Sequence, residues 1–393
     1  DQKAAGRRWF VQQRQGQCGR RRPILGRGRQ ARGHEPPQAV LHGQILGDLD
    51  AAGLEELYVD GVVEVAVRVQ FVEADLDRMQ VLRHAGDASG SPLGSPAGRS
   101  SVRGWPDCGW LACPSMGAAV EIELFVETFG PLDGDPVLLI SGADAHCTRW
   151  TPALIDPLVA AGHLVVRFDN RDSGLSTKMP ADVGYTLDDM AADALSVLDD
   201  LGLGGAHVVG RSMGGMIGQV LALDHPGRVR SLTLLCSSPG LGDDRLPAAA
   251  DWLVDRMADR LFDPPPATHD DRVAWVVELD GLFTGPLFPV DPATSMVVAD
   301  SEVHRCWYPE SGHGTAVAVS PSRLDRLGEI ATRTLVVHGT ADPVFTVEHA
   351  LALAEGIPDS ELWLVEGLGH EVPDACLADL LPRLLVHLAR QPS

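Results

Sequence analysis

The chain has 393 residues, with 32 Lys and Arg against 54 Asp and Glu, which gives a formal net charge of −22. That length suffices for one large domain with an extension, and the acidic balance argues against nucleic acid or an anionic membrane as a partner. Seven cysteines show no metal-ligand spacing, and their odd number favours a reducing compartment, so we expect a cytoplasmic protein without a metal site.

The N-terminal part of the chain differs in composition from the rest. Residues 1–33 contain nine Arg and one Lys against one Asp, and residues 87–104 are rich in Gly, Ser and Pro, as a linker is. Three interpretations stay open: a disordered basic arm, a small accessory domain around the alternating stretch 54–82, or sequence upstream of the natural start. We favour the third, because Met116 directly precedes the alternating residues 120–125, which predict a first strand.

No apolar run in the sequence approaches the length of a membrane span. Arg7 and Arg8 resemble a twin-arginine export signal, but polar and basic residues follow them where such a signal needs an apolar core. We therefore predict no export and no membrane partner. The chain divides into an extension, residues 1–115, and one domain, residues 116–393.

Predicted strands and helices alternate through this domain, as in a doubly wound, mostly parallel α/β sheet. The strands are predicted at residues 120–125, 136–141, 164–168, 206–209, 231–236, 332–339 and 361–365. Helices are predicted from residues 151, 186 and 213 and over residues 374–388. Residues 239–330 break this alternation.

One Gly-x-Ser-x-Gly pentapeptide, residues 210–214, joins the predicted strand at 206–209 to a predicted helix that begins at Met213. A strand that turns sharply into a helix exposes the hydroxyl of Ser212 at the helix N-terminus, where backbone N–H groups can stabilise an oxyanion. The pentapeptide alone is a weak signal in a chain with 42 glycines, but its setting makes it a strong one.

A serine nucleophile needs a base, and the base needs a carboxylate to orient it. Asp342 and His370 each follow a predicted strand, 130 and then 28 residues further along the chain. Each has an alternative interpretation: Asp342 as a helix N-cap before Pro343, His370 as a loop histidine, and Ser212 as a turn serine. Their occurrence together, in the order of the α/β-hydrolases, favours a catalytic triad.

These motifs resemble the α/β-hydrolase superfamily and, within it, the anthracycline (aclacinomycin) methylesterase group. The resemblance covers residues 116–393 and rests on residues 138–143, 166–176, 210–214, 221–225 and 367–370. It implies an oxyanion hole formed by the backbone N–H groups of Met213 and Ala143. Many relatives have His-Gly before the second donor, whereas this chain has Ser141-Gly142. It also implies that the loop at 169–176 is structural.

The interruption at about 239–330 lies where this fold usually carries a helical cap over the active site. Its aromatic residues are candidates for the roof of an apolar pocket, Trp252, Phe283 and Trp307 among them, although we expect most to form the core of the cap itself. His304 and His313 also lie in this stretch, and we expect both at the surface.

The sequence thus predicts a serine hydrolase that cleaves a carboxylic ester of a small to medium apolar substrate through an acyl-enzyme, without metal or organic cofactor. Cofactor-free haloperoxidase or perhydrolase activity and carbon–carbon bond hydrolysis use the same triad and remain open. A catalytically silent binding protein of this fold is the alternative from another class. Oligomeric state and physiological substrate are not predicted.

Overall fold

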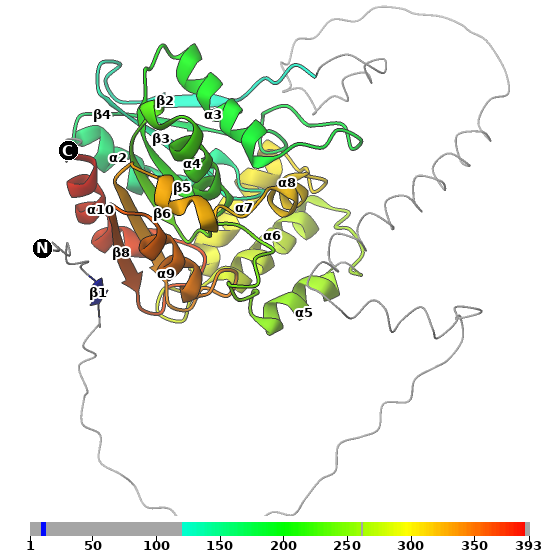
Figure 1. Cartoon of the computed structure of the whole chain (residues 1–393). Coiled ribbons are helices and arrows are strands. Elements are labelled where there is room, and N and C mark those ends of the chain that lie inside the picture. Colours follow the sequence, from blue (N-terminus) through cyan, green and yellow to red (C-terminus); the bar gives the residue numbers. More distant parts are fainter. Residues whose placement is uncertain (1–8, 13–119, 261, 390–393) are drawn as a thin grey trace, which may run out of the picture. The chain divides into compact units, whose positions relative to one another are not determined.

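Eight strands form one sheet in the computed structural model, which describes residues 9–12, 120–260 and 262–389 (Figure 1). The order across the sheet is β1-β8-β7-β6-β5-β3-β4-β2. Only β2 runs antiparallel to its neighbour among these strands. The strands are β1 (Trp9–Gln12), β2 (Val126–Phe129), β3 (Asp135–Ile140), β4 (His163–Phe168), β5 (Ala206–Arg211), β6 (Val229–Leu235), β7 (Thr334–Gly339) and β8 (Ser360–Val365).

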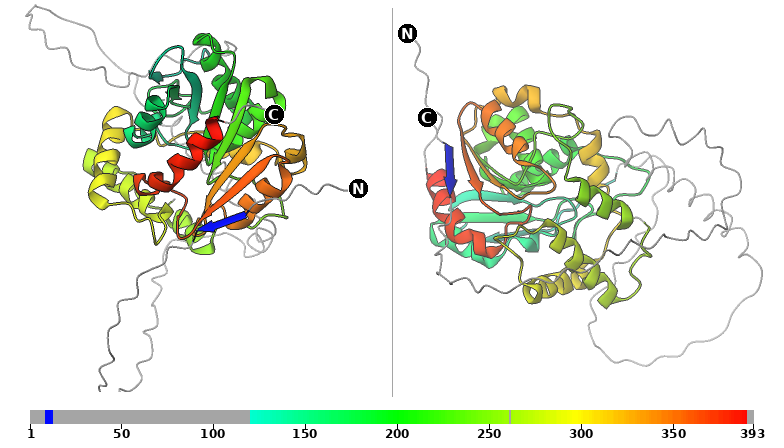
Figure 2. Two further views of the ribbon diagram at one scale, coloured as in Figure 1. Left: turned by 90° about the vertical axis from the view of Figure 1, so that its left-hand side faces the viewer. Right: turned by 90° about the horizontal axis from the view of Figure 1, so that it is seen from below.

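Helices cover both faces of the sheet. One face carries α3 (Leu187–Asp200), α4 (Met213–Asp224) and α9 (Val347–Gly356), and the other carries α2 (Pro152–Ala160) and α10 (Asp374–Ala389). Figure 2 shows α10, in red, lying across its face of the strands. Short 3-10 turns are η2 (Cys147–Arg149), η3 (Pro226–Arg228) and η4 (Leu324–Glu329).

The central strands are apolar on both sides because both sides are covered. In β3, Val137 and Leu139 face the core under α2 and α10, while Leu138 and Ile140 face the core under α3 and α4. All four side chains are fully buried. The run of consecutive apolar residues that predicted this strand therefore arises because the strand contributes side chains to a core on each face of the sheet.

Four helices between β6 and β7 form the cap: α5 (Asp251–Arg260), α6 (His269–Phe283), α7 (Pro292–Arg305) and α8 (His313–Val319). The cap interrupts the alternation of strands and helices at the predicted place. Its own core is small, with Val273, Ala299 and Val303 buried against one another.

Most predicted elements agree with the structure to within a few residues, but the strand predicted at 120–125 is wrong. The first strand of the domain is β2, and residues 120–125 instead run beside the loop after β4. There the N–H groups of Asp169 and Thr177 donate to the carbonyls of Phe125 and Glu123, both at 3.0 Å. Backbone pairing with a loop produces the same alternation of side chains as pairing in a sheet.

Within the predicted extension, only β1 is described, and it pairs in parallel with β8. The predicted basic arm, alternating stretch, linker and start at Met116 otherwise lie outside the described residues. Among the described residues, no helix combines the length and apolarity needed to cross a bilayer, and no cluster of His, Cys, Asp and Glu has the make-up of a metal site.

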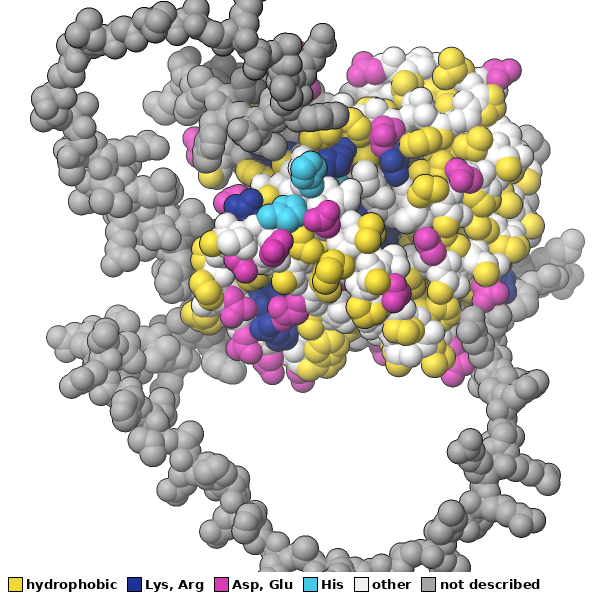
Figure 3. Space-filling model, turned by 180° about the vertical axis from the view of Figure 1, so that it is seen from behind, with side chains coloured by type: hydrophobic (Ala, Val, Ile, Leu, Met, Phe, Trp, Pro, Cys, Tyr) yellow, Lys and Arg dark blue, Asp and Glu magenta, His cyan; other side chains and the backbone are white. Residues whose placement is uncertain are grey.

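The surface of the domain is acidic, and its acidic and basic side chains are not separated into distinct regions. Residues 116–393 contain 17 Lys and Arg against 41 Asp and Glu. Figure 3 shows acidic side chains spread over one face among hydrophobic and uncharged ones, with the basic side chains in small groups between them. No continuous basic surface is visible on that face.

Candidate active site

The turn between β5 and α4 holds Ser212 in a left-handed backbone conformation, with φ = 52°. For a residue other than glycine, such a conformation costs on the order of 1–3 kcal/mol and needs support from its surroundings. The glycines on either side supply the space. A Cβ atom on Gly210 would collide with the backbone of Gly214, and one on Gly214 would collide with that of Ile140. The sequence pattern is therefore what this sharp turn requires.

Ser212, His370 and Asp342 are brought together at the carboxyl ends of β5, β8 and β7. The Nε2 atom of His370 lies 3.0 Å from the Oγ atom of Ser212, and its Nδ1 atom lies 2.8 Å from a carboxylate oxygen of Asp342. Asp342 and His370 are buried and Ser212 is half-buried. The three predicted residues thus form one continuous hydrogen-bonded chain.

The carboxylate of Asp342 is fixed by the backbone as well as by His370. Its other oxygen accepts the N–H groups of Val344 and Phe345 at 2.9 and 3.0 Å. Burial works to raise the pKa of Asp342, but His370, His338 and the N–H of Phe345 outweigh burial and lower it. The alternative of Asp342 as a helix N-cap is wrong, because α9 begins at Val347 with Thr346 at the N-cap.

Two aromatic rings enclose the imidazole of His370 edge-on. The ring centroid of Phe283, at the end of α6, lies 5.8 Å from that of His370, and the centroid of Phe345 lies 5.5 Å away. The carbonyl of Phe283 accepts the N–H groups of both His370 and Glu371, at 2.8 and 3.1 Å. The cap therefore holds the histidine loop directly.

The two residues predicted as oxyanion donors lie in the segments that follow Ser212 and β3. Met213 is the first residue of α4, a position whose N–H has no partner within the helix. Ala143 belongs to a turn after β3 in which the N–H of Ala145 bonds the carbonyl of Gly142 at 3.4 Å. A Cβ atom on Gly142 would lie 3.3 Å from the Cβ atom of Ser212, so this turn passes close beside the serine.

These features agree with comparisons to known proteins. The family model described as the alpha/beta hydrolase fold matches residues 135–374. The chain belongs to this family. It is 32% identical over 295 residues to rhodomycin D methylesterase DnrP of Streptomyces peucetius, covering 68% of this chain and 95% of that protein. It is 31% identical over 295 residues to rhodomycin D methylesterase DauP of Streptomyces sp. strain C5, with the same coverage.

A solved structure shares the fold. The crystal structure of a bromoperoxidase from Bacillus anthracis matches with a TM-score of 0.57 and 24% identity, covering 68% of this chain and 96% of that one. The chain is therefore an α/β hydrolase with esterase-type relatives, as its motifs predict.

The three aromatic residues named as candidates for the roof of an apolar pocket lie in different surroundings. Phe283 contacts the His370 ring, whereas Trp307 packs against the small core of the cap and Trp252 is 53% exposed. His304 is exposed, as expected. The expectation that His313 lies at the surface is wrong, because it is fully buried.

A buried network of ion pairs lies beside the triad and was not predicted from the sequence. Arg211, which precedes Ser212, pairs with Glu371, which follows His370. Arg149, in η2, binds Asp280 of α6 at 2.8 Å and Glu302 of α7 at 2.7 Å, and lies 3.7 Å from Glu371. The network therefore connects the elbow, the histidine loop and the cap. Its only sequence signal is that two of its members adjoin triad residues.

The pKa values of two carboxyl groups in this network are shifted in opposite directions. Burial works to raise the pKa of Glu371, but Arg211 and Arg149 outweigh it, so the pKa is lowered. For Asp280, burial raises the pKa and the attraction of Arg149 is opposed by Glu371, so the net shift is upward. The three carboxyl groups of Asp280, Glu302 and Glu371 share two guanidinium groups.

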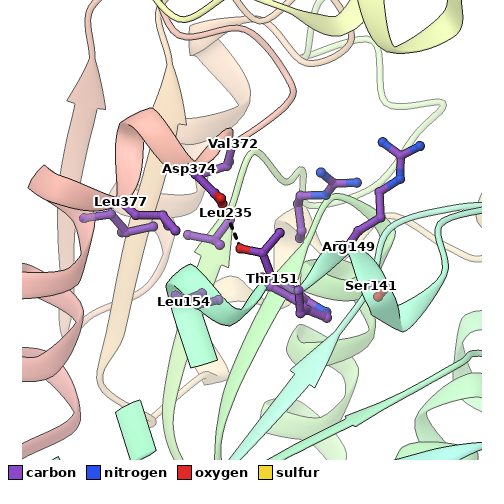
Figure 4. A pocket seen from close by; sticks show the side chains of 11 residues that line it. Ser141, Arg149, Thr151, Leu154, Leu235, Val372, Asp374 and Leu377 are labelled. Carbon is purple, nitrogen blue, oxygen red and sulfur yellow. Dashed lines mark hydrogen bonds between the residues drawn. The ribbon is translucent and has the colours of Figure 1, made fainter. Parts of the chain in front are cut away.

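A small cavity lies behind the elbow, between the starts of α2 and α10 (Figure 4). Its volume is about 30 Å³, which suits water and not an ester. Arg149 and Arg211 contribute to its lining, and Thr151 donates to Asp374 across it at 2.7 Å. Ser212, His370 and Asp342 are not among the residues that line this cavity.

Proposed function

We propose that this α/β hydrolase cleaves carboxylic esters through an acyl-enzyme on Ser212. The observation that carries the proposal is the hydrogen-bonded chain from Ser212 through His370 to Asp342, with distances of 3.0 and 2.8 Å. These distances lie within the reach needed for proton transfer from a nucleophile to a base and for orientation of that base.

Each triad residue has a defined role in this mechanism. His370 takes the proton of the Ser212 hydroxyl through Nε2 as the oxygen attacks the ester carbonyl, and then delivers it to the departing alkoxide. Asp342 holds the proton on Nδ1 and stabilises the imidazolium that forms. Water, activated by the same histidine, then attacks the acyl-enzyme and releases the acid and free Ser212.

Charge on the tetrahedral intermediate falls on the former carbonyl oxygen. The N–H groups of Met213 and Ala143 are the proposed donors to it, aided by the positive end of α4. Both donors are backbone groups, so Ser141 in place of the histidine of many relatives leaves the donor chemistry unchanged. No step in this scheme requires a metal or an organic cofactor.

The substrate we propose is a methyl ester on an apolar body of small to medium size. The support is the identity of 31–32% to two proteins named rhodomycin D methylesterases, together with Phe283 of the cap lying beside the base.

A panel of aromatic methyl esters tests the proposal through released methanol, with wild type and Ser212→Ala compared at equal concentration. We expect turnover by wild type and none by the variant. Bromination that depends on peroxide and a short carboxylic acid would instead identify a perhydrolase. Bleaching of a vinylogous diketone would identify a carbon–carbon bond hydrolase. No turnover in any assay would favour a binding protein.

We also propose that residues 116–393 act as the hydrolase domain in the cytoplasm, with a small molecule as partner and the cap at about 239–330. Deletion of residues 1–115 tests the boundary, although it also removes β1 beside β8. We expect the shortened chain to keep its esterase activity. An aggregated or inactive product would place part of the extension in the working fold.

A further inference from the structure

His313, the first residue of α8, connects two loops at the carboxyl edge of the sheet. Its Nδ1 atom lies 2.8 Å from the backbone nitrogen of Asp144, and its Nε2 atom lies 2.6 Å from the carbonyl oxygen of Arg171. A carbonyl only accepts, so Nε2 carries the proton and donates, while Nδ1 accepts the N–H of Asp144. These two partners define one tautomer of the imidazole, and the Asp144 carboxylate lies 3.3 Å from the same Nδ1 atom.

The loop that His313 contacts holds a strained residue. Asp144 has φ = 59°, a left-handed conformation that is costly for residues other than glycine. It occupies the third position of the turn from Gly142 to Ala145, directly after Ala143. A positive φ at that position distinguishes the types of turn, so relaxation of Asp144 would turn over the peptide unit between Ala143 and Asp144 and change the turn that carries the N–H of Ala143.

The other end of the bridge is firmly anchored. The guanidinium of Arg171 makes two bonds of 2.7 Å to Asp193 of α3. The next residue, Asp172, accepts the N–H of Gly312, which directly precedes the histidine, at 3.1 Å. Because these contacts hold the start of α8 in place, the imidazole of His313 can hold the N–H of Asp144, and with it the turn, in one position.

We propose that His313 is a positioning residue for the oxyanion hole. Its Nδ1 atom holds the N–H of Asp144 and so keeps the turn in the form that presents the N–H of Ala143 beside Ser212. The cap thereby contributes to transition-state stabilisation through the backbone of another segment. This inference rests on the proposed function, because it needs an oxyanion to form at Ser212.

Two substitutions each remove one of the two hydrogen bonds that the His313 side chain makes. In His313→Asn, the amide oxygen takes the place of Nδ1 and can still accept from Asp144. In His313→Gln, the amide nitrogen takes the place of Nε2 and can still donate to Arg171, but the acceptor for Asp144 is lost. Each variant loses one hydrogen bond, so a purely structural role predicts equal losses of stability and of activity.

We expect kcat to fall by roughly 10- to 100-fold in His313→Gln with KM little changed, since misplacement of a transition-state donor acts on kcat. His313→Asn should stay within about threefold of wild type. The rate of labelling by a fluorophosphonate, whose phosphoryl oxygen occupies the same hole, should follow the same order. Equal kcat values in the two variants, with an active wild type, would overturn the inference.

A second pair keeps the buried histidine and removes, in both variants alike, the Asp144 carboxylate that lies 3.3 Å from its Nδ1 atom. Asp144 is exposed, so substitutions there leave the core intact. Asp144→Gly permits a positive φ and should keep kcat, whereas Asp144→Val disfavours it and should lower kcat about tenfold. Equal rates in this pair would also overturn the inference. If wild type neither turns over esters nor labels, the proposed function fails, and this inference fails with it.

Discussion

The side chains of Arg211 and Glu371 form an ion pair that joins the residue before Ser212 to the residue after His370. Both side chains are about 15% exposed, so the pair is shielded from water. Because each partner adjoins one of the two groups proposed to exchange a proton, we expect the pair to restrain the distance between the hydroxyl and the imidazole.

Breaking this pair should lower kcat more than it changes KM. We expect Arg211→Met and Glu371→Gln each to reduce kcat by about 10-fold or more through a looser contact between Ser212 and His370. The double variant should lose little beyond the worse single one, because residues in contact couple by about 0.5–3 kcal/mol. Steady-state kinetics of all four proteins measure this coupling, and strictly additive losses would contradict the restraint.

Asp342→Asn isolates the electrostatic role of the carboxylate. The amide oxygen can still accept the N–H groups of Val344 and Phe345, so the turn should stay folded. The amide nitrogen then faces Nδ1 of His370 and favours the wrong tautomer, so kcat should fall by about 10⁴-fold with little change in KM. A loss smaller than tenfold in a folded variant would show that Asp342 does not orient the base.

Arg149 links the cap to the sheet, and its removal should destabilise the protein. Arg149→Met leaves Asp280 and Glu302 buried without their shared cation, which costs about 3–5 kcal/mol of the free energy of unfolding. The control is Arg245→Met, because the Arg245 side chain is 54% exposed and pairs with Asp243 and Asp325. That change should lower the free energy of unfolding far less, because water screens the exposed guanidinium. Equal urea midpoints for the two variants would contradict this role.

Acid should weaken the protein partly through Glu371. Its pKa is lower in the folded chain than its ordinary value, so its stabilising contribution is complete above about pH 4.5 and is lost as the pH falls through the folded pKa. The difference in unfolding free energy between wild type and Glu371→Gln should therefore shrink as the pH falls from 6 towards 3. Urea unfolding at several pH values measures it. A difference that grows in acid would reverse the sign of the shift.

The sequence was most informative where local patterns determine structure. The elbow and the strand ends that carry Asp342 and His370 follow from motifs of a few residues, whereas the cap was expected from the break in alternation at 239–330 and from the family resemblance. The structure brings the three candidates within hydrogen-bonding distance, as the order of the motifs implies.

Contacts between distant segments were not predictable in this way. Arg149 and Glu302 are 153 residues apart, and no periodicity marks either as a partner of the other. His313 lies in a polar stretch typical of a surface, and only the packing of the cap on the loops after β3 and β4 buries it. A single sequence contains no signal for such pairs beyond the residue types themselves.

The central claim is that Ser212 is an activated nucleophile, and intact-mass analysis after reaction with a fluorophosphonate tests it most directly. Wild type and Ser212→Ala are treated side by side under native conditions. We predict one covalent adduct on wild type and none on the variant. An adduct on both proteins, or on neither, would contradict the claim that the triad centred on Ser212 is assembled and reactive.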